Sequence, residues 1–285
     1  MHPKHTPKGI HIEQLSIPSS RPNTVRLSAL LLRNDLSSPP RHVIVYFQGT
    51  VLSSLIISSF YSYLQFAFVG NAGNPLHRIP MFSVLLNAIP SLAILAPAPR
   101  SYWTSTAARP TQAGLIVDHT AALAFATSRF PTSFLTLYGH SLGASAALCL
   151  LAAHEHESAG ICDVHGLVLE NAFTSVPEML RALYPQRWLP YRYLGPFVRD
   201  RWDAREAARS MRHRALAHRA MVLVSARDEV VPPTMGQQIF DALKPPDGNL
   251  GRLVVLDRAL HEDAWRHRDW SQAMKQYLYD LERKF

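Results

Sequence analysis

The sequence predicts an α/β fold in which a mostly parallel central sheet carries helices on both faces. Short apolar runs, rich in β-branched residues, recur along the chain. Their apolarity is continuous rather than alternating, which is typical of strands buried on both faces. Longer helical patterns separate the runs, so strand and helix alternate as in a doubly wound sheet. A chain of 285 residues, 47% of them apolar, can bury one large core, and we predict a single domain over residues 1–285.

The expected elements follow in order along the chain. Alternating apolar residues at 9–17 and 24–32 predict antiparallel edge strands. Buried strands are expected at residues 42–47, 91–97, 133–139, 165–170, 220–226 and 252–257. Helices are expected at residues 111–129, 142–155, 234–243 and 262–283. Residues 174–218 are rich in Pro, Tyr, Trp and Arg and lie between two strands, so we expect a small cap insertion there.

Charge does not indicate a nucleic-acid partner. The net charge is +8, but Lys and Arg are spread along the chain apart from a local excess at residues 199–219. No recognition motif accompanies that excess, so we expect no nucleic acid. A solvated basic helix face, or attraction to anionic lipid, fits it better.

The cysteines and the other ligand-type residues predict neither a disulfide framework nor a cofactor. Cys149 and Cys162 are the two cysteines, which favours a reducing, intracellular compartment. The clusters HEHE at 154–157 and HED at 261–263 lack the H-E-x-x-H spacing of zinc hydrolases, so no metal is predicted. The first residues lack the apolar core of a signal peptide. If the chain reaches a membrane, we expect it to do so by another route, such as peripheral contact, or to have lost an N-terminal anchor.

A short glycine-containing stretch carries the clearest chemistry. Gly139, Ser141 and Gly143 form a G-x-S-x-G pattern that follows a predicted strand and opens an Ala/Leu-rich helix. This is the context of a nucleophile elbow, whose tight turn requires small neighbours and whose helix N-terminus stabilises developing negative charge. We predict that Ser141 is a catalytic nucleophile; the alternative is that it only caps the helix. His140 is expected to point away from the pocket.

A serine nucleophile needs a base, and the base needs an acid that orients it. After a nucleophile elbow, the acid and then the histidine follow on loops after later strands. Asp228 comes just beyond the predicted strand at 220–226, and His261 just beyond the strand at 252–257. We therefore predict Asp228 as the acid and His261 as the base, with Glu229 as the rival acid.

Four further stretches make the chain resemble a known family. They are residues 98–118 (APRSYWTSTAARPTQAGLIVD), 167–179 (LVLENAFTSVPEM), 228–243 (DEVVPPTMGQQIFDAL) and 261–265 (HEDAW). With the elbow, they resemble the membrane-associated branch of the α/β-hydrolase-domain serine hydrolases, which holds protein depalmitoylases and lysophospholipid lipases. The resemblance extends from residue 42 to the C-terminus. It implies the α/β-hydrolase fold, with Ser141, Asp228 and His261 as nucleophile, acid and base.

The implied reaction is acyl transfer from an ester or thioester to water, and it needs an oxyanion hole with two backbone donors. One donor is expected to be the N–H of Leu142, directly after the nucleophile. The other should come from the turn after the strand at 42–47. Because an uncharged stretch interrupts this turn, Thr50 and Asn71 are both candidates for that donor.

The cap provides the expectation about the substrate, which is an acylated lipid or an acylated protein. Trp188, Tyr191 and Tyr193 are expected to line an acyl pocket, although each could simply pack the cap on the domain. Arg192 lies among them and would suit an anionic headgroup or a membrane surface.

Residues 50–70 are apolar, uncharged and hard to place in such an enzyme. As a membrane span, residues 51–69 are marginal in length, and a single crossing would separate the first strands from the rest of the sheet. Deleting residues 50–70 leaves VIVYFQGNAGNPLHR, which reads without interruption like the family. We hypothesise that the stretch is a translated intron. A genuine insertion loop and a membrane-dipping element are the alternatives.

Other functional classes remain open at this level. An inactive hydrolase fold used for binding would fit the interrupted oxyanion turn. A peptidase or C–C hydrolase would also fit, because the fold does not determine the chemistry.

Overall fold

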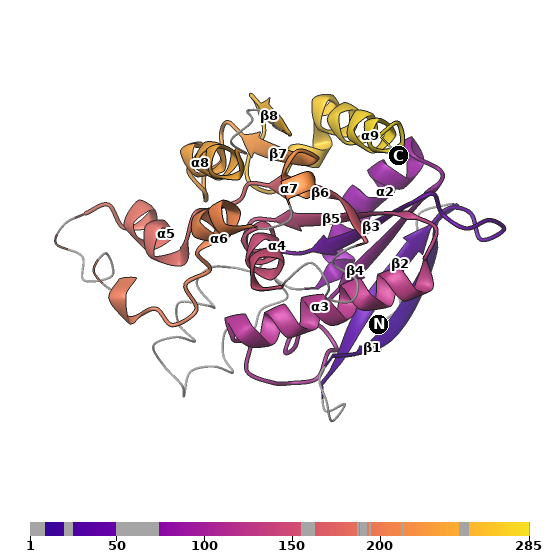
Figure 1. Cartoon of the computed structure of the whole chain (residues 1–285), viewed down its shortest axis with the longest axis horizontal. Helices are drawn as coiled ribbons and strands as arrows, with labels where there is room; N and C mark the ends of the chain where they lie inside the picture. Colours follow the sequence, from indigo (N-terminus) through magenta and orange to yellow (C-terminus); the bar gives the residue numbers. More distant parts are fainter. Residues whose placement is uncertain are drawn as a thin grey trace.

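The structure is a computed structural model that describes residues 9–19, 25–49, 74–154, 163–186, 188, 193, 195–211, 214–244 and 251–284. An eight-stranded sheet with helices on both faces runs through this part of the chain (Figure 1). The strands are β1 (His11–Pro18), β2 (Arg26–Arg33), β3 (His42–Phe47), β4 (Leu92–Pro97), β5 (Phe134–His140), β6 (Val164–Glu170), β7 (Ala220–Ser225) and β8 (Arg252–Leu256). The main helices are α2 (Ile79–Ala88), α3 (Gln112–Arg129), α4 (Leu142–Ala153), α5 (Val176–Leu183), α6 (Ala204–Ser210), α7 (Arg214–Ala217), α8 (Pro233–Leu243) and α9 (Arg268–Glu282). The predicted α/β class is confirmed.

The topology explains which loops meet. The strand order is β1-β2-β4-β3-β5-β6-β7-β8. β1 pairs antiparallel with β2, and β2 antiparallel with β4, as predicted. β1 is an edge strand, but the prediction of a second edge strand at 24–32 is wrong, because β2 lies between β1 and β4. All pairings from β4 to β8 are parallel. Since β5 lies between β3 and β6, the turns that follow these strands emerge side by side at one edge of the sheet.

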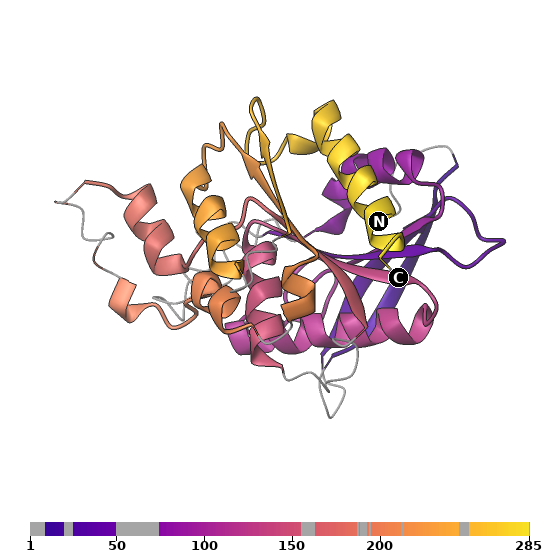
Figure 2. The same ribbon diagram turned by 45° about the horizontal axis from the view of Figure 1, so that its top comes forward.

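The central strands are apolar along their whole length because their side chains pack into two cores, one on each face of the sheet. In β3, Val43, Val45 and Phe47 belong to the core that includes residues of α3, α4 and α8. Ile44 and Tyr46 belong to the opposite core, with residues of α2 and α9. The two helix layers are visible on either side of the sheet (Figure 1, Figure 2). A polar residue within such a strand would therefore be buried on either face.

Two predicted elements differ from the observed ones near the C-terminus. β8 was expected to be buried on both faces, but it is the edge strand, and Val255 is 52% exposed. The expected helix at 262–283 begins later, because a turn and the short 3₁₀ helix Ala264–Arg266 precede α9 at Arg268. That turn carries His261.

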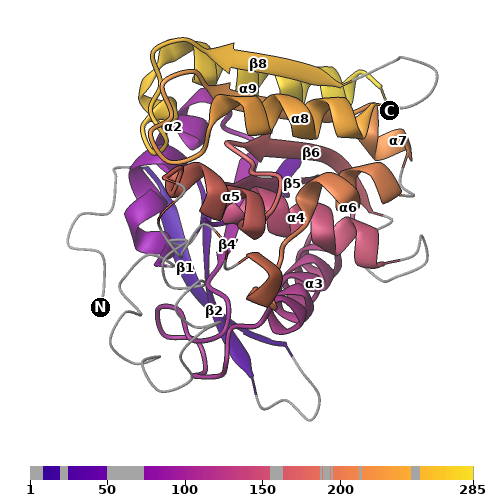
Figure 3. The same ribbon diagram turned by 90° about the vertical axis from the view of Figure 1, so that its left-hand side faces the viewer.

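The expected cap region, residues 174–218, divides into two parts. α5 and the 3₁₀ turn Gly195–Phe197 lie at the end of the molecule that faces the viewer in Figure 3. α6 instead contributes Ala204, Ala207 and Ala208 to the core shared with α4 and α8. The uncharged residues 50–70 lie outside the described residues. Within the described part of the chain, no helix combines the length and apolar composition needed to cross a membrane.

A buried ion pair anchors α3 to the loop after β4. The Asp118 carboxylate is fully buried and accepts hydrogen bonds from Arg100 through Nε (2.9 Å), Nη2 (2.8 Å) and the backbone N–H (2.9 Å). Ser19 Oγ also donates to this carboxylate. Because four donors converge on one buried group, loss of its charge leaves them without a matched acceptor.

We therefore expect Asp118→Asn to lower the free energy of unfolding by about 3–5 kcal/mol, the usual cost of breaking a buried pair from one side. Urea denaturation of the folded variants measures this effect. The matched control is Arg252→Ala, which breaks the exposed 2.7 Å pair with Asp280 and should cost at most about 1 kcal/mol. Equal losses in the two variants would contradict the structural role assigned to Asp118.

Candidate active site

Ser141 occupies a strained turn between β5 and α4. Its backbone has φ 54° and ψ −119°, a conformation that non-glycine residues rarely adopt. The Ser141 N–H donates to the carbonyl of Glu170 at 2.8 Å, which ties the turn to the end of β6. Among the described residues, the Ser141 side chain makes no capping hydrogen bond to α4. The strain therefore does not serve helix capping, and it presents the hydroxyl at the head of the helix.

The glycines of the elbow permit close backbone contacts. A Cβ on Gly139 would lie 2.4 Å from both Ala144 Cα and the Gly143 carbonyl oxygen. A Cβ on Gly143 would lie 2.0 Å from the carbonyl oxygen of Phe47, the last residue of β3. Neither position accepts a side chain, so both glycines allow β3, β5 and α4 to meet at Ser141.

His261 and Asp228 form a buried pair at the ends of β8 and β7. The His261 Nδ1–H donates to Asp228 Oδ2 at 2.7 Å, and both side chains are almost fully buried. The other carboxylate oxygen of Asp228 accepts the N–H groups of Val230 (2.8 Å) and Val231 (2.7 Å), which fixes its orientation. Glu229, the rival acid, instead accepts the backbone N–H of His261 at 3.1 Å. The ring of His261 is therefore oriented by Asp228.

The structure brings the turn that carries His261 to the elbow that carries Ser141. The rings of His261 and His140 lie 4.9 Å apart, centroid to centroid, and His140 immediately precedes Ser141. In the described structure, Ser141 Oγ and the His261 ring are not hydrogen-bonded to each other. Such bonds are commonly long in the absence of substrate. The arrangement brings Ser141, His261 and Asp228, the predicted nucleophile, base and acid, to neighbouring strand ends.

The turn after β3 approaches the nucleophile directly. A Cβ on Gly49 would lie 2.8 Å from Ser141 Cβ and 2.8 Å from the His140 carbonyl oxygen. Leu142 is the first residue of α4, and its N–H is one of those that have no acceptor within the helix. The two candidates for the second donor, Thr50 and Asn71, lie outside the described residues.

The predicted substrate residues of the cap are only partly described. The side chain of Trp188 is 80% exposed and that of Tyr193 is 58% exposed, so neither is enclosed in a pocket. Tyr191 and Arg192 lie outside the described residues. Trp202, by contrast, is fully buried in the core that also includes residues of α5 and α6.

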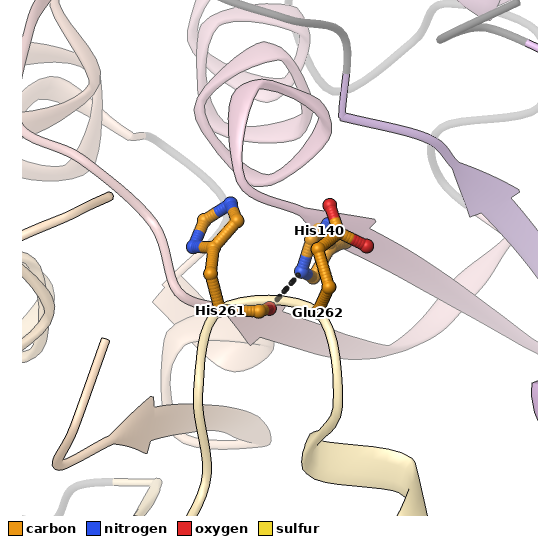
Figure 4. A group of neighbouring side chains, drawn as sticks. All are labelled: His140, His261 and Glu262. Atoms are coloured by element: carbon orange, nitrogen blue, oxygen red, sulfur yellow. Dashed lines mark hydrogen bonds between the residues drawn. The ribbon is translucent and has the colours of Figure 1, made fainter. Parts of the chain in front are cut away.

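Three ligand-type side chains gather beside the base. Figure 4 shows His140, His261 and Glu262, whose potential ligand atoms all lie within 4.8 Å of one another. His140 Nε2–H donates to the His261 carbonyl (2.9 Å), and the Glu262 carboxylate pairs with Arg78 Nη1 (2.5 Å). Since the His261 Nδ1 faces Asp228, a cation here would occupy the nitrogen of His261 that proton transfer from Ser141 requires. We therefore interpret the cluster as part of the candidate site that contains Ser141, His261 and Asp228.

A cavity of about 340 Å³ lies elsewhere in the molecule. His218, Arg219, Arg252 and Tyr277 are among the residues that line it. It adjoins the first residues of β7 and β8, whereas Asp228 and His261 follow the last residues of these strands. This cavity therefore lies at the opposite strand ends from Asp228 and His261.

Two polar residues beneath the site, Glu170 and Asn171, have no role that the sequence pattern predicts. Burial raises the pKa of the Glu170 carboxyl, against the effect of hydrogen bonds from Tyr138 and from Trp270 Nε1 (3.0 Å). Asn171 is buried and has a positive φ of 50°. The available signal was their position, since both come at the end of an otherwise apolar strand.

The chain has recognisable relatives, although no protein-family model matches it. It is 25% identical over 237 residues to protein bem46 of Schizosaccharomyces pombe, which covers 82% of this chain and 67% of that protein. It is 27% identical over 210 residues to WAV2 of Arabidopsis thaliana, an α/β hydrolase domain-containing protein, covering 70% of this chain and 63% of WAV2. The chain thus spans about two thirds of the length of these relatives.

Solved structures share the fold at low sequence identity. The esterase Pf2001 of Pyrococcus furiosus superposes with a TM-score of 0.64 at 16% identity, over 95% of this chain and 93% of that one. Acetyl xylan esterase 1 of a Thermoanaerobacterium species superposes with a TM-score of 0.59 at 14% identity, over 98% and 86% of the two chains. At these identities the likeness establishes the fold alone.

Proposed function

We propose that this chain, an α/β-hydrolase-domain protein related to bem46 and WAV2, is a serine hydrolase that cleaves acyl esters or thioesters. The observation that carries the proposal is the joint arrangement of a strained Ser141 and a buried His261–Asp228 pair at adjacent strand ends. A serine held only for structural reasons would not need this backbone conformation beside an oriented histidine.

The reaction follows from these positions. His261 Nε2 accepts the proton of Ser141 as the hydroxyl attacks the acyl carbonyl, and Asp228 stabilises the charge that forms on the ring. The leaving alcohol or thiol takes the proton from His261, and an acyl-enzyme remains. Water, activated by the same histidine, then releases the acid and restores Ser141.

The developing oxyanion needs backbone donors at the elbow. Leu142 N–H, at the start of α4, is the first, and the helix N-terminus adds favourable electrostatics. We assign the second donor to the turn after β3, at Thr50 or Asn71. The close approach of Gly49 to Ser141 supports this assignment.

For the substrate we propose a long-chain acyl group on a protein or a lysophospholipid, as for a palmitoyl-protein hydrolase or lysophospholipase. The family resemblance and the exposed aromatic residues of the cap support this class, with Trp188 and Tyr193 as acyl contacts. The same resemblance, with the net charge of +8, supports peripheral contact with anionic membranes at an intracellular location.

Fluorophosphonate labelling tests the proposal. Folded wild-type protein should form a covalent adduct at Ser141, and Ser141→Ala should form none. A panel of p-nitrophenyl esters, acyl thioesters, lysophospholipids and aminoacyl amides then identifies the substrate class. Folded wild-type protein that takes up no label would disprove the proposal.

The second candidate function is an impaired hydrolase fold used for binding. Residues 50–70 favour it, because they interrupt the turn that should supply an oxyanion donor. A chain that carries this insertion has two candidate donor turns, and only one can stand opposite Leu142.

Deleting residues 50–70 should consequently raise turnover. Loss of one oxyanion donor typically costs about 10²–10³ in kcat, so a gain of up to that size is expected if the insertion displaces the donor. Hydrolysis of one ester by both versions, at matched concentrations of folded protein, measures the effect. Equal rates would contradict the prediction, and transcript sequencing across the junction tests whether the stretch is a translated intron.

A further inference from the structure

The main chain of His261 is held by side chains from three neighbouring strand ends. Its carbonyl accepts hydrogen bonds from His140 Nε2 at 2.9 Å and from Asn171 Nδ2 at 3.1 Å. Its N–H donates to Glu229 at 3.1 Å. His140 ends β5, Asn171 follows β6 and Glu229 lies beyond β7, so the loop after β8 is held by the strands inside the sheet.

Several hydrogen bonds orient the side-chain amide of Asn171 toward the His261 carbonyl. Its Oδ1 accepts the N–H of Ser225 at 2.9 Å, and its Nδ2 donates to Ser225 Oγ at 3.0 Å as well as to the His261 carbonyl. Its own N–H donates to the Leu223 carbonyl at 2.9 Å. Asparagine tolerates the positive φ of this residue better than most side chains, and its amide supplies both donors from one rigid plane.

His140 supplies the second donor from beside the nucleophile. Burial, together with the positive charge of Arg78, holds the pKa of His140 well below its usual range, so the ring is neutral. A carbonyl only accepts, so the proton of the neutral ring lies on Nε2. The ring therefore links the residue before Ser141 to the backbone of the base.

We propose that Asn171 and His140 are positioning residues that set the distance between His261 and Ser141 by clamping the His261 carbonyl. The inference rests on the proposed function, because it concerns the base of the proposed reaction. Neither residue transfers a proton. Asn171 fixes the base relative to β6 and β7, whereas His140 fixes it relative to the elbow.

Kinetics of four variants test the clamp. Asn171→Gly suits the positive φ but removes the amide, and His140→Leu removes the ring donor. Each should lower kcat roughly 10- to 100-fold with little change in KM, the scale expected for small misplacement of a reacting group. His140→Gln, which keeps a donor near Nε2, should retain most of the activity. The double variant Asn171→Gly/His140→Leu should lose less than the product of the single losses, because both groups hold one carbonyl.

Ser225→Ala is the matched control. It removes a buried partner of the Asn171 amide but leaves the bond to the His261 carbonyl, so kcat should stay near that of the wild type. Proton NMR adds a readout of the base itself. The downfield resonance of the His261 Nδ1–H bonded to Asp228 should shift or broaden in Asn171→Gly and stay unchanged in Ser225→Ala.

The outcomes separate this inference from the proposed function. Absence of labelling in the folded wild type counts against the hydrolase, and the NMR comparison then tests the clamp on its own. The clamp is wrong if folded Asn171→Gly and His140→Leu keep the wild-type kcat and labelling rate. It is equally wrong if the Nδ1–H resonance does not move in Asn171→Gly, or if Ser225→Ala loses as much kcat as Asn171→Gly does.

Discussion

Replacing Ser141 with alanine should lower kcat by about 10⁶-fold, the loss measured when the triad serine is removed from a serine hydrolase. The strained turn holds the hydroxyl at the head of α4. The measurement is turnover of an activated ester under conditions where both proteins are folded.

Ser145→Ala is the control for this substitution. Ser145 lies on the same helix and is fully buried, and its hydroxyl donates to the Phe173 carbonyl at 2.9 Å. Its loss should cost stability of about 1 kcal/mol and leave turnover intact. Comparable losses of kcat in the two variants would mean that packing of α4, rather than nucleophilic attack, explains the effect of Ser141→Ala.

Asp228→Asn should lower kcat by about 10⁴-fold, as expected when the acid of a serine triad becomes an amide. The two backbone N–H groups of Val230 and Val231 hold one oxygen of the side chain. The NH₂ group of the variant side chain would therefore face His261 Nδ1. Because an NH₂ group donates, His261 Nδ1 would have to lose its proton in order to accept the hydrogen bond. The ring would then carry its proton on Nε2, where it cannot accept one from Ser141.

Glu229→Gln distinguishes the two neighbouring acids. Among the described residues, Glu229 accepts a hydrogen bond only from the backbone N–H of His261, and a glutamine oxygen can accept it equally well. Its kcat should remain within an order of magnitude of the wild type, as expected for replacement of a charged acceptor by a neutral one. A larger loss in Glu229→Gln than in Asp228→Asn would reverse the assignment of the acid. The pH dependence of kcat/KM in both variants reports whether the base still titrates.

Much of the fold could be predicted from the sequence, because buried parallel strands have a distinctive composition. The central runs correspond to β3 to β7 within a residue or two at each end. The position of β8 at the edge of the sheet could not be predicted, because its apolar run resembles the runs of the interior strands. The order of strands in a sheet depends on tertiary structure. The start of α9 at Arg268 could not be predicted either, because the residues directly after His261 are also compatible with a helix.

The sequence predicts the candidate catalytic residues of the site, but it does not predict the residues that hold their backbone in place. Position after a strand end was enough to nominate Asp228 and His261, which the structure brings together. His140 was expected to point away from the pocket, yet its ring lies against that of His261 and bonds its backbone. No periodicity reveals such a contact, because it joins residues from strands whose adjacency is known only in three dimensions.

The attachment of the His261 loop to interior strands affects how the protein responds to partial unfolding. Local opening generally begins at sheet edges and chain ends, which exchange their amide hydrogens most readily. β8 is one of the two edge strands, but the partners that hold the His261 main chain are residues at the ends of β5, β6 and β7. Fraying of β8 thus need not dislodge the base, and heat inactivation should track the opening of the sheet centre rather than that of its last strand.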